Sequence, residues 1–126
     1  MKIVSAVARY LLGLIFVFFG SNLFFHFLPM PAPHGLVGQF EGALAASHYI
    51  YAVAFFQVVP ALLLLANRYV PLGLTLLAPV IFNIILTHLL MAPSGLPMAA
   101  LVTVLWFLVF WRVHTAFHGL FQAKVD

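Results

Sequence analysis

The chain has 126 residues, of which 66% are hydrophobic and only 6% are charged. Together with a mean hydropathy of +1.20, this composition excludes an ordinary water-soluble globule and indicates one membrane domain over residues 1–126. Cysteine is absent, which excludes a disulfide relay, a thiolate nucleophile and a thiolate-bound metal or cluster within this chain.

Four apolar runs predict four membrane-spanning helices, at residues 7–28, 48–66, 71–91 and 97–113. Each run is long enough to cross a hydrocarbon core of ~30 Å at ~1.5 Å per residue. The expected fold class is therefore all-α, an integral membrane four-helix bundle with a long first outer loop. The first run is longer than a signal-peptide core and no A-x-A-like site follows it, so we expect an uncleaved helix.

Charge predicts the orientation of this bundle. Four crossings put the N-terminus, the second connection and the C-terminus on one side, and that side carries every basic residue of the chain: Lys2, Arg9, Arg68, Arg112 and Lys124. The opposite side carries Glu41. The positive-inside rule then places both termini in the cytoplasm. The basic residues are scattered, and no cluster suits a nucleic-acid partner.

The first predicted helix has two distinct faces. Gly13 and Gly20 are seven residues apart, near one face, where small residues allow close helix packing in lipid. Asn22 and His26 lie at i and i+4 on the opposite face. Pro29, Pro31 and Pro33 are expected to stop the helix, because proline cannot continue its hydrogen-bond ladder.

The predicted outer loop spans residues 29–47. Its start, PMPAPHG, indicates extended or turn backbone. Its second part, GLVGQFEGALAASHY, is compatible with a short interfacial helix, and Ser47 is a candidate N-cap for the second span.

Prolines mark the later spans. Pro71 suits the first turn of the third helix, and Pro97 suits the start of the fourth. Pro79 should kink the third helix and free a carbonyl near Thr75. Residues 112–126 are expected to form a mildly polar helical extension, in which His114 and His118 occupy an interfacial helix.

Polar residues within three spans define a candidate site. Counting at ~1.5 Å per residue, Asn22, Gln57 and Asn83 lie about 9–13 Å below the outer edge, and His26, Thr87 and His88 lie one turn further out. If all of them face inward, they form a polar funnel that opens outward. The candidate ligand-binding residues are Asn22, His26, Gln57, Asn83 and His88, with no catalytic or metal-binding residue assigned. The competing interpretation is that the amides only hold the helices together.

Haem and metal sites are weaker alternatives. His26 and His88 have matching depths for a haem pair, but His88 lies about 140° around its helix from Asn83, at ~100° per residue. His26, His34, His48 and Glu41 offer suitable metal ligands without the spacing of a metal motif.

Two motifs resemble the DoxX family of small bacterial membrane proteins. The first span reads RYLLGLIFVFFG from Arg9 to Gly20, and the second reads QVVPALLLL from Gln57 to Leu65. The resemblance implies a four-helix bundle, with Arg9, Gly13 and Gly20 matching the family's first-helix pattern. Gln57 takes the place of the family's usual acidic residue, and Pro60 and Ala61 replace its glycine pair. The amide keeps hydrogen bonding but loses proton exchange.

The expected function follows from the candidate funnel and this resemblance. We expect a multi-pass protein of the bacterial cytoplasmic (inner) membrane that is not a stand-alone enzyme. It would bind quinone or another lipid-soluble ligand for an oxidoreductase partner, or assemble as a homo-oligomer. The alternatives are a small-molecule transport protein and a structural scaffold without ligand. Transport is less favoured, because the inner halves of the helices offer only Ser5 and Thr75 as polar groups.

Overall fold

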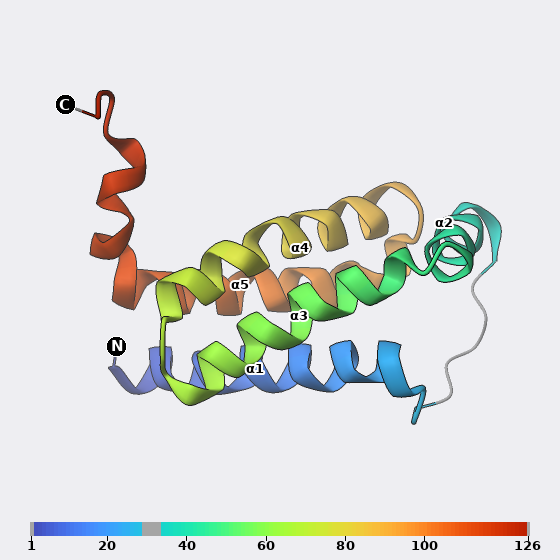
Figure 1. The fold of residues 1–126 in the computed structure, drawn as a ribbon, viewed down its shortest axis with the longest axis horizontal. Helices are drawn as coiled ribbons and strands as arrows, with labels where there is room; N and C mark the ends of the chain where they lie inside the picture. The colour runs from blue at the N-terminus through green and yellow to red at the C-terminus, as the bar shows by residue number, and fades with distance from the viewer. Residues whose placement is uncertain (1, 29–33, 126) are drawn as a thin grey trace.

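The computed structural model describes residues 2–28 and 34–125, and the regular elements within these ranges are all helices (Figure 1). Their bounds in chain order are α1 Lys2–Phe25, α2 Gly35–Ala46, α3 Tyr49–Ala66, α4 Val70–Leu90, the short 3₁₀ helix η1 Pro93–Gly95, α5 Leu96–Val113 and the 3₁₀ helix η2 His114–Phe121. The stretches α1, α3, α4 and η1–η2 (Pro93–Phe121) are each long and apolar enough to cross a membrane. An all-helical fold is confirmed.

The four long helices form an antiparallel up-and-down bundle (Figure 1). α1 packs against α3 and α5, and α4 packs against the same two helices, so each long helix has two neighbours. Both described chain ends lie at one end of the bundle. α2 forms in the first loop, in the part whose sequence is compatible with a short interfacial helix, and it lies across the other end and packs on α3.

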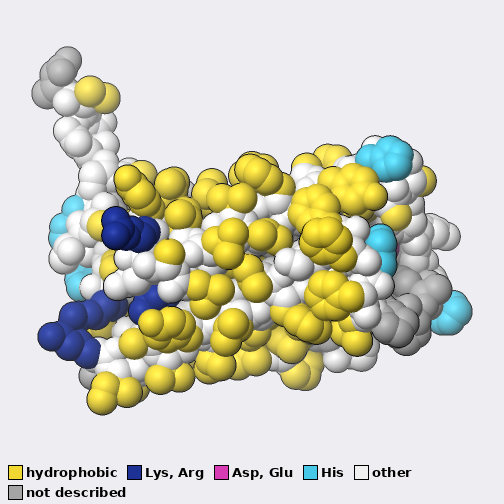
Figure 2. Space-filling view, turned by 60° about the horizontal axis from the view of Figure 1, so that its bottom comes forward, with side chains coloured by type: hydrophobic (Ala, Val, Ile, Leu, Met, Phe, Trp, Pro, Cys, Tyr) yellow, Lys and Arg dark blue, Asp and Glu magenta, His cyan; other side chains and the backbone are white. Residues whose placement is uncertain are grey.

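The two ends of the bundle differ in charge (Figure 2). We call one the basic end, because the lysine and arginine side chains visible in this view gather there, at the end where Figure 1 marks both termini. The other is the loop end, which holds α2 and η1. Between them the visible surface is covered by hydrophobic side chains. This banding is what a membrane-spanning bundle requires.

The helix boundaries agree with the predicted spans to within a few residues, except at α1. α1 runs over Lys2–Phe25, whereas the sequence predicts residues 7–28. The helix ends early because His26 adopts a left-handed conformation, with φ of 52°. The predicted extended run at residues 29–33 lies outside the described residues.

The predicted N-cap of the second span is wrong by one residue. Ser47 is the C-cap of α2, and His48 occupies the N-cap position of α3 with φ of 64°. The Ser47 hydroxyl donates to the Ala43 carbonyl at 2.7 Å, and its oxygen accepts the Tyr49 N–H at 3.3 Å. Ser47 therefore serves both helix ends, which a pattern for a helix start alone does not reveal.

Glycines allow the closest helix contacts. A Cβ added at Gly13 would lie 2.8 Å from Leu65 Cγ and 3.1 Å from the Ala61 carbonyl oxygen. A Cβ at Gly20 would lie 2.8 Å from Val58 Cγ2. The predicted glycine face of α1 is thus packed on α3, as expected for helices that associate by close backbone approach.

The buried core is concentrated toward the basic end. Leu12, Leu64, Leu74 and Val109 are fully or almost fully buried, one from each long helix. In α4 the last buried residue is Ile81, and no residue from Phe82 to Leu90 is buried. The interior of the bundle is consequently less tightly closed near the loop end.

Three side chains tie neighbouring helices through main-chain carbonyls. Ser5 Oγ on α1 donates to the Leu108 carbonyl on α5 at 2.9 Å. Trp106 Nε1 on α5 donates to the Leu74 carbonyl on α4 at 2.9 Å, one residue before the carbonyl that Pro79 is predicted to free. The Arg9 guanidinium donates to the Leu64 carbonyl in the last turn of α3. A cation at a helix C-terminus also interacts favourably with the helix dipole.

Gly13→Ala tests the α1–α3 contact. Because the added methyl overlaps Leu65 and approaches a backbone oxygen, we expect a loss of about 1–3 kcal/mol in the free energy of unfolding. Gly42→Ala in α2 is the matched control, since nothing lies within 4 Å of its added Cβ. Unfolding in detergent micelles, followed by circular dichroism, measures both. Equal stability of the two variants would contradict the packing described.

Candidate functional site

The five predicted ligand-binding residues do not form a common inward-facing funnel. Asn22 is buried, with 7% of its surface exposed. Gln57 and His88 are half-buried, whereas His26 and Asn83 are exposed. The inward orientation expected for His26 and Asn83 is therefore wrong.

Asn22 closes the end of α1. Its Oδ1 accepts the Leu28 N–H at 2.8 Å, and its Nδ2 lies 3.4 Å from the Leu28 carbonyl oxygen. The Asn22 carbonyl accepts the His26 N–H at 2.8 Å. The side chain thus satisfies main-chain groups just past the helix, so it is neither interhelical glue nor an open ligand contact.

Asn83 and its neighbour one turn away bond to their own helix. Asn83 Nδ2 donates to the Pro79 carbonyl at 2.8 Å, and Thr87 Oγ1 donates to the Asn83 carbonyl at 2.8 Å. Both bonds link residues i and i−4, a local solution that hydroxyl and amide side chains adopt within helices. Pro79, Asn83 and Thr87 follow one another at four-residue spacing, but the sequence did not predict that Asn83 would be exposed.

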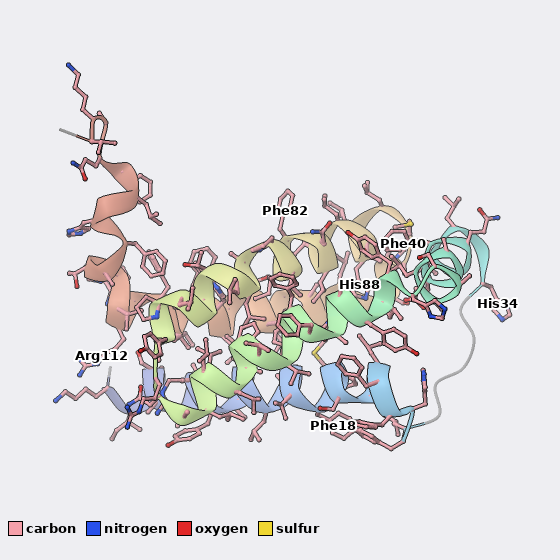
Figure 3. All side chains as sticks on the ribbon, in the orientation of Figure 1. Phe18, His34, Phe40, Phe82, His88 and Arg112 are labelled. Carbon is pink, nitrogen blue, oxygen red and sulfur yellow. The ribbon has the colours of Figure 1, made fainter. Side chains whose placement is uncertain are left out.

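His88 lies at the loop end of α4, half-buried beneath the turn to α5 (Figure 3). Its Nδ1 is 2.8 Å from the Ile84 carbonyl oxygen. A Cβ added at Gly95 would come within 2.0 Å of the His88 ring, so the imidazole occupies the space a side chain would need there. His88 is consequently held by η1, and only a glycine fits above it.

Gln57 differs from the other amides of the long helices. It is half-buried on α3 beside Gly20 of α1, whose added Cβ would lie 3.0 Å from the Gln57 Cβ. Ser21 follows Gly20 in α1 and is also half-buried. Within residues 2–28 and 34–125, Gln57 and Ser21 are the Ser, Thr, Asn or Gln side chains of the long helices that make no hydrogen bond. Their polar atoms also keep some exposure.

Ser21 is a candidate that the sequence reasoning missed. Serine is common in membrane helices, so a serine within a span does not by itself indicate a ligand site. Ser21 stands out only in the structure, because it follows Gly20, which contacts α3 beside Gln57. We refer to Ser21 and Gln57 together as the uncommitted pair.

Two hollows lie on the apolar surface. One, of about 610 Å³, runs along the loop-end half of α1 and is lined by Leu14, Ile15, Val17, Phe18, Phe19, Ser21 and Phe27. The other, of about 200 Å³, lies between α4 and α5 and is lined by Ala78, Ile81, Phe82, Ile85, Thr103, Trp106 and Phe107. Ser21 thus belongs both to the uncommitted pair and to the larger hollow.

Metal and haem ligands are not brought together in the described part of the chain. No group of three or more His, Asp or Glu side chains there could hold a metal ion. His26 is exposed past the end of α1, while His88 is held against Gly95. His114 and His118 lie with ring centroids 6.2 Å apart on η2, at the basic end.

A double-mutant cycle tests the contact between His88 and Gly95. Gly95→Ala should displace the imidazole and break its bond to Ile84, lowering the free energy of unfolding by about 1 kcal/mol. In the His88→Ala background the same substitution should cost little, because the space is then empty. Unfolding midpoints of the four proteins give the coupling, and additive effects would rule out the contact.

In comparisons with known proteins, no family model, no curated protein and no solved structure matches the chain. The resemblance to the DoxX family therefore remains a prediction from the two helix motifs.

Proposed function

We propose that this chain is a DoxX-like protein of the bacterial cytoplasmic membrane that binds a quinone, or a similar lipid-soluble ligand, for an oxidoreductase partner. The four long apolar helices support the membrane assignment. The basic residues gathered at the end with both termini support an orientation with that end in the cytoplasm. The loop end then faces outward.

The observation that carries the binding proposal is the uncommitted pair, Ser21 and Gln57. An amide in hydrocarbon without a partner costs several kcal/mol, so a side chain retained there calls for a ligand, water or another protein. Its neighbours in the spans satisfy themselves locally, as Asn83 does with Pro79. A quinone carbonyl is an acceptor that both an amide and a hydroxyl can bond.

The hollow along α1 supplies an apolar surface beside Ser21. Ser21 is its polar lining residue, and aromatic rings such as Phe18 and Phe27 line the rest. These two rings lie edge to face, with centroids 5.3 Å apart. We infer that the polar head of the ligand bonds Ser21 and Gln57 while its isoprenoid tail lies in this hollow, open to lipid.

This chain would supply binding and orientation rather than a redox centre. It has no cysteine, and its acidic residues are Glu41 on α2 and the terminal Asp126. Electrons would therefore pass between the ligand and a partner subunit. A scaffold function is the second candidate, favoured by the local hydrogen bonds of Asn22, Asn83 and Thr87.

Gln57→Leu and Asn83→Leu form a matched pair of tests. Both remove an amide at similar depth, but only Gln57 lies unbonded at the α1–α3 contact. Mass analysis of organic extracts from the purified proteins should find near-stoichiometric quinone in the wild type and in Asn83→Leu, and its loss from Gln57→Leu.

The stability of Gln57→Leu separates a site from interhelical glue. If the amide serves a ligand, the ligand-free variant should be as stable as the wild type or more stable, because a costly polar group is gone. Lower stability with an unchanged extract would favour the scaffold. Only bulk lipid in every extract would refute quinone binding.

A further inference from the structure

The C-terminal segment leaves the bundle sideways. η2 runs crosswise to the long axis of the bundle at the basic end and extends past its side (Figures 1 and 2). Phe117 is the one buried residue of η2, and the centroid of its ring lies 5.0 Å from the ring centroid of Phe110 on α5. Every residue from 118 to 125 is exposed. The segment is therefore fixed at its base and uncovered beyond it.

The uncovered part is apolar as well as basic. Leu120, Phe121 and Val125 are 70%, 84% and 92% exposed, which is unfavourable for such side chains in water. His118, Gln122 and Lys124 alternate with them along the chain. Segments that mix large apolar and basic residues in this way lie in the boundary between lipid headgroups and acyl chains.

The charges at the basic end indicate which kind of surface the exposed segment can bind. Arg112 lies just before η2 at the basic end (Figure 3) and Lys124 follows η2, while Lys2 begins α1 and Arg68 lies in the α3–α4 turn. Glu41 belongs to α2 at the opposite end, and Asp126 lies outside the described residues. A basic, apolar surface beside a membrane-spanning bundle complements anionic lipid headgroups.

We propose that residues 114–125 dock on the anionic lipid headgroups of the leaflet at the basic end, beside the bundle. Leu120 and Phe121 enter the headgroup boundary, and Lys124 and Arg112 face lipid phosphates. A membrane-spanning bundle puts this crosswise segment parallel to the membrane plane and past the protein edge, over lipid. The inference rests on the membrane-spanning part of the proposed function and not on ligand binding.

The absence of cysteine makes single-site labelling direct. Phe121→Cys, carrying an environment-sensitive fluorophore, reports the docked segment in the full chain. Nanodiscs of phosphatidylcholine alone are compared with nanodiscs in which part of that lipid is phosphatidylglycerol. We expect blue-shifted emission and protection from an aqueous quencher only with phosphatidylglycerol, with both lost at high salt. Aqueous emission in both lipids, or equal protection in both, overturns the proposal.

Phe82→Cys separates this inference from the membrane assignment. Phe82 is an exposed ring on α4 that points away from the bundle (Figure 3). Its label should report lipid in both nanodiscs. An aqueous Phe82→Cys label would refute the membrane-spanning proposal itself, whereas a lipid signal there with an aqueous label at residue 121 refutes only the docking.

Charge substitutions test whether the basic residues of the segment itself contribute to its binding to anionic lipid. In the Phe121→Cys background, Lys124→Gln should lower the ratio of lipid-bound to free segment about fivefold. This is the contribution expected from one basic residue near an anionic membrane surface. Arg68→Gln, in the α3–α4 turn at the same end, is the control for net charge and should change the ratio far less. Equal shifts overturn the proposal. The proposal is also overturned if a second copy of the chain, and not lipid, protects the label. Proximity between labels on two copies, in either lipid, would show this.

Discussion

A polar group in hydrocarbon has no water to bond. In the membrane orientation proposed for the four long helices, this constraint explains why their polar side chains bond to main-chain atoms. Within residues 2–28 and 34–125, each side-chain hydrogen bond involves a main-chain atom. Thr75, Asn83 and Thr103 reach the carbonyl four residues earlier in their own helices. Ser5, Arg9 and Trp106 instead reach carbonyls on neighbouring helices, which converts the same constraint into ties between α1, α3, α4 and α5.

The same constraint gives Gln57 and Ser21 their significance. Side chains that bond their own backbone need no partner and specify no ligand, so a polar residue inside a span is not by itself a site. Gln57 lies where Gly20 brings α1 against α3, and Ser21, the residue after Gly20, lines the hollow along α1. A ligand that enters from the bilayer could reach this position without a channel through the bundle. The tight core at the basic end, around Leu12 and Leu74, argues against a continuous polar path.

The lengths of the apolar runs, the proline positions and the charges predicted the four helices and the gathering of basic residues, because these depend on sequence-local physics. The glycine face of α1 was also predictable, since small residues at helical spacing have few other uses in lipid. Side-chain orientation was not predictable at Asn83, because an amide can satisfy itself on its own helix and then face either way. His26 was misplaced because α1 ends in a left-handed turn three residues before Pro29. Ser21 is recognisable as a candidate ligand-binding residue only from its neighbours in the structure.

Quinone binding at Gln57 is tested most directly by the side-chain amide resonance of Gln57 in lipid bilayers, with the protein labelled with ¹⁵N on its glutamine side chains. Gln39, Gln57 and Gln122 are the glutamines of the chain, and Gln39 and Gln122 are exposed and serve as internal controls. If Gln57 and Ser21 bind quinone, adding quinone shifts the Gln57 amide signal and slows its exchange with water, while the other two signals stay unchanged. An unmoved Gln57 signal at saturating quinone would contradict binding at the uncommitted pair.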